Sequence, residues 1–177
     1  LPKYLNIFGD NITSITIPKS VSEIACDSNY LLVRYGELEE SAFNPFQCKN
    51  LKRIIVEEGN VNFKAIDGIL YKKNKDSESG AETLSLFVCP QSIEKEDIVV
   101  PSNVTGISAG AFKECETIKT VTLPDGVGGF STQTFYGCGN LEKVTMNVTG
   151  IDVGAHAFGG CKKLTDISNV HVRNVGR

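Results

Sequence analysis

The chain has 177 residues, of which 41% are hydrophobic and 22% are charged, and its formal net charge is −3 at pH 7. This balance is typical of a soluble protein with a sizeable core. The 21 acidic residues outnumber the 18 Lys and Arg, and no basic block appears, which argues against a nucleic-acid partner. No apolar run reaches the roughly 18–20 residues that a membrane-spanning helix requires. The sequence opens without Met or a charged leader, so we interpret it as a mature form or an excised part of a larger protein.

The first predicted strand ends in "ITIP" (15–18), and the next comparable one ends in "IIVE" (54–57). Ile15 and Ile54 are 39 positions apart, which exceeds the 23-residue period found farther along the chain. We assign the excess to an insertion at 26–40 within an irregular N-terminal repeat.

An inserted β-hairpin is predicted at about 64–90. The segments 62–74 and 83–89 have the pattern of two strands, and the polar run between them suits a hairpin tip. Asp67-Gly68 provides a tight turn at the start of the first strand, because glycine tolerates positive φ. The hairpin would replace the helical side of one coil.

Regular repeats are predicted over 96–168, because several residue types recur there every 23 positions. They are Phe112, Phe135 and Phe158; Cys115, Cys138 and Cys161; Ile118, Leu141 and Leu164; and Ile98, Val121, Val144 and Ile167. Each unit shows a strand of about three residues, which Pro or a polar residue ends, and then a short helical or 3-10 turn at Ala-Phe. Since one such coil cannot bury its apolar side alone, stacking is required. The pattern predicts an α/β solenoid, a right-handed leucine-rich-repeat-like coil with short parallel strands.

Four cysteines occupy one place in the repeat: Cys48, Cys115, Cys138 and Cys161. Equivalent residues of stacked coils lie about 5 Å apart, so one pair could be bridged, but a whole row cannot pair evenly. We therefore expect free thiols that face the core. The chain contains no Cys-x-x-Cys, which argues against a structural zinc site.

The segments "ITIPKSVSEI", "SNVTGISAGAFKECETIKTVTLPDGV" and "NFKAIDGILYKKN…LSLFVCP" together resemble the BspA-like leucine-rich repeat family. The resemblance covers nearly all of 1–177, which we interpret as a single domain. It departs from the family pattern where two extra residues separate Ala42-Phe43 from Cys48 and where Asn147 replaces Pro. It implies a surface-exposed or secreted protein of host-associated microbes, with roles in adhesion and partner binding, and it brings no catalytic residues.

Catalytic chemistry finds little support in the residues. His156 aligns with Gly110 and Gln133 at a variable position, which suggests a solvent-exposed coil residue, and His171 lies in the irregular tail. No nucleophile elbow, phosphate loop or metal loop is present. We expect no enzyme, no cofactor and no metal.

Outward strand positions would form a sheet face that is open to binding. The full set is Ser14, Thr16, Arg53, Ile55, Asp97, Val99, Thr120, Thr122, Lys143, Thr145, Asp166 and Ser168. The candidate binding residues are Arg53, Ile55, Thr120, Thr122, Lys143, Thr145, Asp166 and Ser168. The same residues also suit half-solvated strands chosen only for β propensity. Tyr30, Tyr35 and Tyr136 are the expected exposed aromatic residues, and the insertion and hairpin tip are alternative contact loops.

The leading hypothesis is a non-catalytic extracellular or cell-surface module for adhesion or protein binding, with a host or neighbouring-cell protein as partner. One alternative is a module that binds carbohydrates or glycoconjugates. Another is a structural spacer within a larger surface protein.

Overall fold

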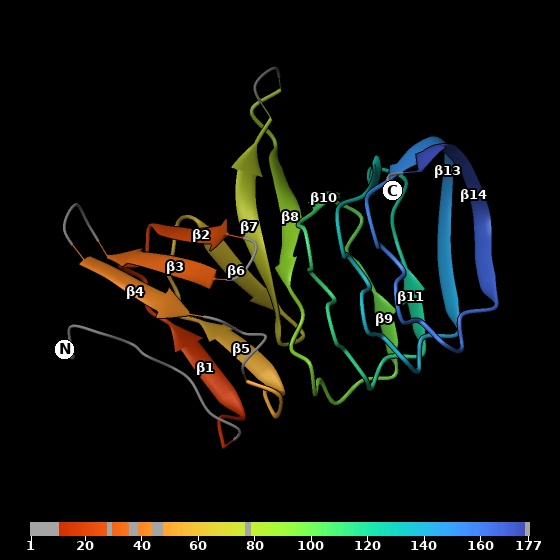
Figure 1. The fold of residues 1–177 in the computed structure, drawn as a ribbon. Coiled ribbons are helices and arrows are strands. Elements are labelled where there is room, and N and C mark those ends of the chain that lie inside the picture. Colours follow the sequence, from red (N-terminus) through yellow and green to blue (C-terminus); the bar gives the residue numbers. More distant parts are fainter. Residues whose placement is uncertain (1–10, 28–29, 36–38, 44–47, 77–78, 176–177) are drawn as a thin grey trace.

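The computed structural model describes residues 11–27, 30–35, 39–43, 48–76 and 79–175. These residues wind into a β-solenoid with parallel strands, which confirms the predicted leucine-rich-repeat-like solenoid but not its α/β character (Figure 1). They form strands and turns and contain no helix. The strands are β1 (Ser14–Ile17), β2 (Glu23–Asp27), β3 (Tyr30–Tyr35), β4 (Glu39–Phe43), β5 (Arg53–Val56), β6 (Phe63–Ile66), β7 (Ile69–Lys75), β8 (Glu82–Val88), β9 (Asp97–Val99), β10 (Val104–Ile107), β11 (Thr120–Thr122), β12 (Gly129–Phe130), β13 (Lys143–Val153) and β14 (Asp166–Val175).

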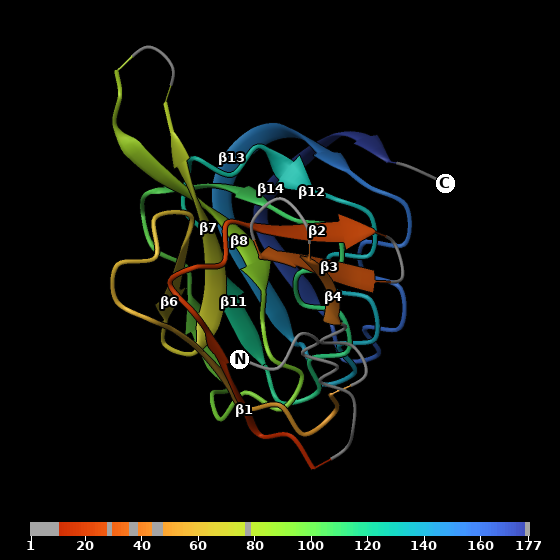
Figure 2. The same ribbon diagram turned by 90° about the vertical axis from the view of Figure 1, so that its left-hand side faces the viewer.

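The regular coils have three walls, which stack from coil to coil. Wall 1 is the parallel sheet of β9, β11 and the first residues of β13 and β14. Wall 2 contains β8, β10, β12 and the last residues of β13 and β14. β8 pairs in parallel with β10, and β12, β13 and β14 pair in parallel with one another in that order, while β10 contacts β12 without forming a ladder with it. Wall 3 consists of the turns 108–115, 131–138 and 154–161, whose backbones are hydrogen-bonded between coils. Figure 2 views this stack from the side of its N-terminal coils.

Wall 3 shows why the prediction of helical or 3-10 turns is wrong. A 3-10 helix needs successive amides that bond within their own segment. Here the amides alternate: Lys113 N bonds Gly110 O of the same turn at 2.9 Å, whereas Phe112 N bonds Thr134 O of the next coil at 2.9 Å. Gly110 and Glu114 have positive φ values of 65° and 58°, which is typical of the third residue of a type II turn. The same sign recurs at Gln133, Gly137, His156 and Gly160.

Proline decides where the strands of wall 1 end. β9 and β11 are three residues long and stop shortly before Pro101 and Pro124, as predicted. The expectation that a polar residue also stops a strand is wrong at Asn147. There β13 continues for 11 residues around the corner into wall 2 and pairs with the 10-residue β14. Asparagine keeps the amide that proline lacks, so the ladder can continue.

The interior of the regular coils consists of ladders of equivalent side chains. The Phe112 and Phe135 rings stack at 4.9 Å between centroids, and Phe135 and Phe158 stack at 5.3 Å. Phe130 of wall 2 packs edge-on against Phe135 at 5.7 Å. The fully buried ladder residues include Phe112, Phe135, Cys115, Cys138, Ile118, Leu141, Val121 and Val144. Inward placement is thus confirmed for these residues, while Phe158, Cys161 and Leu164 of the following coil are half-buried.

The N-terminal part contains two further sheets. β1 and β5 pair in parallel, with Ile15 opposite Ile54. The chain between them forms an antiparallel sheet in the order β2-β3-β4, which includes most of the insertion predicted at 26–40. The side chains of Tyr30 and Tyr35 lie outside the described part of the structure, so their exposure stays a prediction.

The inserted hairpin contains three strands rather than the two that were predicted. β6 and β7 are antiparallel and meet at Asp67-Gly68, where both residues have positive φ (54° and 82°). This two-residue turn is of the kind that matches strand twist in hairpins. β8 returns antiparallel to β7 and then pairs in parallel with β10, so the hairpin joins wall 2 and projects from it (Figure 1).

The hairpin separates two hydrophobic cores. Leu70 and Val88 pack into an N-terminal core with Ile54, whereas Tyr71 and Leu86 pack into the core of the regular coils. Burial raises the pKa of Tyr71, so its phenol is neutral. The hairpin thus acts as a partition that contributes side chains to both sides.

A buried amide links the hairpin to the first coil. Asn60 is 3% exposed, and its Nδ2 donates to the carbonyls of Pro18 (2.9 Å) and Val21 (3.1 Å). Its Oδ1 accepts from the amides of Asn62 (2.9 Å) and Phe63 (2.8 Å). All four hydrogen-bonding positions of the side chain are therefore satisfied.

Candidate binding surface

Wall 1 places six of the eight predicted binding residues on one outer face. Strand register arranges this face in two rows, because alternate residues of a strand point to the same side. The charged row is Asp97, Thr120, Lys143 and Asp166. The uncharged row is Val99, Thr122, Thr145 and Ser168. Between the rows, Val121 and Val144 face the core and are fully buried.

The polar side chains of the charged row are hydrogen-bonded or ion-paired to one another. Thr120 Oγ1 donates to Asp97 Oδ1 at 2.6 Å, and Lys143 Nζ lies 2.8 Å from Asp166 Oδ2. Ser168 Oγ also donates to Asp166, at 2.6 Å. The hydrogen bonds from Lys143 and Ser168 lower the pKa of Asp166, which keeps it ionised and paired. These side chains hold neighbouring coils together and leave little unpaired charge for a ligand.

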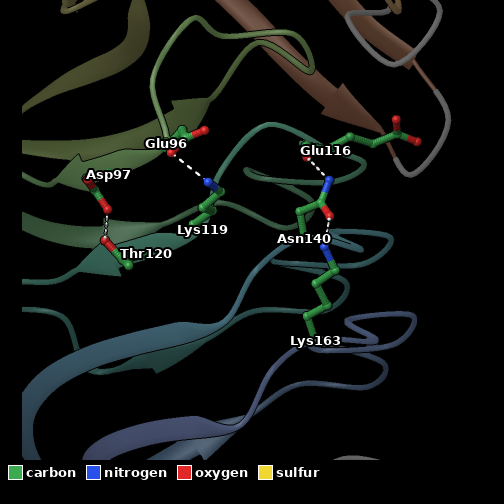
Figure 3. A network of polar contacts seen from close by, with 7 residues as sticks. All are labelled: Glu96, Asp97, Glu116, Lys119, Thr120, Asn140 and Lys163. Carbon is green, nitrogen blue, oxygen red and sulfur yellow. Dashed lines mark hydrogen bonds and ion pairs between the residues drawn. The ribbon is translucent and has the colours of Figure 1, made fainter.

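A polar ladder continues beside the charged row, where the chain enters wall 1 (Figure 3). Lys119 Nζ pairs with Glu96 at 2.8 Å. Asn140 Nδ2 donates to Glu116 O at 2.7 Å, and Lys163 Nζ donates to Asn140 Oδ1 at 2.7 Å. Two of these contacts follow the 23-residue period, since Glu96 and Lys119, and likewise Asn140 and Lys163, are equivalent positions. The repeat spacing therefore contains a signal for this ladder.

The ladder borders an open hollow of about 460 Å³. Its lining residues are Ile93, Glu94, Lys95, Glu96, Glu116, Thr117, Lys119 and Asn140. Several of its charges are already paired, for example Glu94, which Lys52 contacts at 2.6 Å. The hydrogen bond from Lys52 lowers the pKa of Glu94. The hollow is a surface depression bordered by ion pairs.

The uncharged row offers a different surface. Val99 is 75% exposed, and Thr122 beside it is exposed too. Methyl groups and small hydroxyls alternate here without a charge. Such a strip carries no charge that another surface would have to desolvate, although its hydroxyls would need hydrogen-bond partners in the contact.

Arg53 and Ile55 do not join this face. Both lie on β5, which pairs with β1 and with no strand of wall 1. The Asp67-Gly68 turn stands between the two sheets: Gly68 O accepts from Ile54 N at 2.8 Å, and Asp67 pairs with Lys95 at 2.7 Å. The predicted eight-residue surface is thus divided into a six-residue face and a separate pair.

Tyr136 is 38% exposed on wall 3, which confirms its predicted exposure. Lys113 Nζ lies 5.8 Å from the centre of its ring. Gly159 of the next coil lies beside the ring, and a Cβ at that glycine would come within 2.9 Å of Tyr136 Cδ2. The glycine therefore provides the space in which the ring rests.

The remaining candidate residues concern catalysis and metal binding. His156 is exposed, as predicted. Among the described residues, no group of three or more His, Cys, Asp or Glu side chains could hold a metal ion. The described part of the chain also lacks any helix with the length and apolar character needed to cross a bilayer.

Two solved structures that resemble this chain come from bacteria. The pneumococcal vaccine antigen PcpA matches with 24% identity and a TM-score of 0.69 over 94% of this chain. The chain spans 36% of the PcpA structure, about a third of its length. A leucine rich cell surface protein from Faecalibacterium prausnitzii matches with 19% identity and a TM-score of 0.48, over 71% of this chain and 43% of that one.

Comparison with curated proteins finds no match. A family profile, described as the BspA type leucine rich repeat region, matches residues 85–176 in six copies. The matched span is more than half of the chain and contains all the regular coils. The chain therefore belongs to the BspA type leucine-rich repeat family.

Proposed function

We propose that the chain is a non-catalytic interaction module that binds a protein partner through the uncharged row of wall 1. The proposal rests on a difference in charge and exposure between the two rows. Lys143 and Asp166 neutralise each other, while Val99 and Thr122 stay exposed and uncharged. The face therefore suits a partner that is recognised by shape and apolar contact, rather than by long-range charge attraction.

An extracellular or cell-surface location, with adhesion to a host or neighbouring-cell protein, is the finer part of the proposal. The family assignment supports it, and PcpA, which shares the fold, is a vaccine antigen. Antibodies against wall 1 would be expected to label intact cells that produce the protein. Labelling only after permeabilisation would contradict this location.

The binding face can be tested with one added charge. Immobilised wild-type protein would be exposed to serum and extracellular-matrix proteins, in parallel with Thr122→Glu and the control Thr105→Glu. Thr105 is exposed on β10 of wall 2, so the control carries the same charge on another wall. A partner of the uncharged row would bind the wild type and the control and be lost with Thr122→Glu. Equal binding to all three proteins would overturn the assignment of this face.

Salt provides an independent test of the same proposal. Because the charged row is paired internally, the affinity for the partner should change less than about threefold between 0.05 and 0.5 M NaCl, although the Debye length falls to a few Å. Surface plasmon resonance would measure this. A loss of affinity of a hundredfold or more would show that charge attraction dominates.

Carbohydrate binding is the second candidate, and Tyr136 is the observation that favours it. An exposed tyrosine with a neighbouring lysine is a possible platform for a sugar ring. Tyr136→Ala should then abolish binding on a glycan array, while Thr122→Glu should leave it unchanged. The opposite pattern would assign the ligand to wall 1.

A further inference from the structure

Two pairs of thiols lie along the interior of the regular coils. All four cysteines concerned are free. Cys115 Sγ donates to Cys89 O at 3.5 Å, and Cys161 Sγ donates at 3.0 Å to Phe135 O of the coil that carries Cys138. The members of the first pair are both buried, whereas Cys161 is only half-buried. The two pairs therefore differ in one property, which is access from solvent.

The coils that carry Cys138 and Cys161 are held in register by the backbone. Phe135 N donates to Ala157 O at 2.7 Å, and Gly137 N donates to Gly159 O at 2.8 Å. Strands that are bonded in this way lie about 4.8 Å apart. This spacing falls within the range of about 4.4–6.8 Å that separates the Cα atoms of disulfide partners.

The two side chains point in the same direction. Cys138 Sγ donates to Phe112 O at 2.9 Å, and Cys161 Sγ donates to Phe135 O at 3.0 Å, so each thiol reaches back to the preceding coil. The neighbouring Cys138 lowers the pKa of Cys161. The more accessible sulfur is therefore also the one that more readily becomes a thiolate, which is the nucleophilic form.

We propose that Cys161 and Cys138 form a thiol–disulfide exchange site, which a small-molecule disulfide such as glutathione disulfide converts into an inter-coil disulfide, while Cys89 and Cys115 stay reduced. Cys161 loses its proton and attacks the small disulfide, which gives a mixed disulfide and one released thiolate. Cys138 then loses its proton and attacks the Cys161 sulfur, which expels the second thiolate. Two protein thiols are oxidised, the reagent is reduced to two thiols, and the two protons end on those thiols.

The geometry also explains why the bond would be reversible. Disulfide-bonded Cβ atoms lie about 3.8 Å apart, roughly 1 Å less than the spacing of coils, so the Cys161 coil must move toward its neighbour. Strained disulfides are the more easily reduced ones.

Peptide mapping by mass spectrometry would test the proposal on the folded chain. After incubation with glutathione disulfide, the expected result is a cross-linked peptide pair that contains Cys138 and Cys161 and has lost two hydrogen atoms. Dithiothreitol should restore both thiols. Thiol labelling should find at least tenfold more free thiol in the Cys89 and Cys115 peptides than in the Cys138 and Cys161 peptides.

Three variants distinguish the steps. Cys138→Ser should trap Cys161 as the mixed disulfide with glutathione, because the resolving thiol is missing. Cys161→Ser should give no cross-link and no glutathione adduct at Cys138. Cys115→Ser, the matched control at a buried ladder position, should leave the cross-link intact. The proposal would be overturned if the wild type stopped at the mixed disulfide, or if the cross-link involved Cys89 or Cys115.

Discussion

Asn60 is a single residue on which several backbone groups depend. Its side chain serves two carbonyls of the first coil and two amides that lead into the hairpin. A buried group with this many partners is costly to remove, because the partners lose their hydrogen bonds and remain out of water.

Asn60→Ala is expected to lower the free energy of unfolding by about 2–3 kcal/mol, since it leaves carbonyls and amides unpaired in the interior. Urea denaturation would measure the change. Asn62→Ala is the matched control, because Asn62 is only half-buried. If Asn62→Ala lowered the free energy of unfolding as much as Asn60→Ala, the special role of the Asn60 hydrogen bonds would be contradicted.

His156 occupies a position where the backbone conformation is the same in each coil although the residue type differs. Its φ is 53°, and the equivalent residues in the two preceding coils are Gly110 and Gln133, also with positive φ. The variation in residue type between coils predicts only that this position is exposed to solvent. The structure shows that the constraint lies on the backbone, and a non-glycine residue there costs about 1–2 kcal/mol.

His156→Gly should therefore raise the free energy of unfolding by about 0.5–1 kcal/mol, after allowance for the greater flexibility of glycine in the unfolded chain. Thr132→Gly, at an exposed position without positive φ, should lower it by a similar amount. Thermal denaturation of the three proteins would decide. A loss of stability in His156→Gly would contradict the turn geometry.

At the level of elements, the ladders of inward-facing side chains could be predicted from the sequence. The turns of wall 3 and the extension of β13 could not. Phe112 and Phe135 occupy one repeat position, and Cys138 occupies another with its own equivalents. Each position recurs in phase because stacked interiors need the same side chain at the same height. The turns of wall 3 escaped prediction because Gly, Glu, Gln and His share a conformation there without a shared side chain. The extended β13 escaped it because Asn147 and proline look alike as strand-ending residues, although only proline lacks the amide.

The stacked rings lead to a graded prediction. Phe112→Ala and Phe135→Ala should each cost about 3–5 kcal/mol, as truncations of buried aromatic residues do. Phe158→Ala should cost less, because Phe158 is half-buried. Thr122→Ala, on the outer face, should change stability by less than about 0.5 kcal/mol. Denaturation curves in which Thr122→Ala loses more stability than Phe135→Ala would reverse the assignment of inner and outer positions.

The candidate site was less predictable than the fold. The two outward rows follow from strand alternation, so Thr120, Thr122 and Lys143 could be placed correctly. The separation of Arg53 and Ile55 from them could not, since it depends on how the Asp67-Gly68 turn sits between two sheets. Local sequence does not specify that long-range contact.

Across the whole molecule, the two hydrophobic cores should behave as neighbouring units of different stability. Solenoid coils contact only adjacent coils, so the loss of a core residue weakens its surroundings first. Leu51 lies in the N-terminal core and Phe135 in the core of the regular coils.

Hydrogen exchange should reveal this locality. Leu51→Ala should speed exchange at least tenfold in β1 and β5 and leave β11 and β13 within about threefold of the wild type. Phe135→Ala should give the reverse pattern. A uniform increase in both variants would instead indicate one cooperative unit.

The projecting end of the β7–β8 hairpin has a practical consequence. Asp76 and Ser79 hold the turn by local contacts, with Ser79 N and Oγ both donating to Asp76 Oδ1 at 2.7 Å. Residues 79–82 at this end are exposed, and neither core uses them. A foreign peptide grafted after Ser79 would be displayed far from the packed interior, so the scaffold is suited to carrying an epitope without redesign of its repeats.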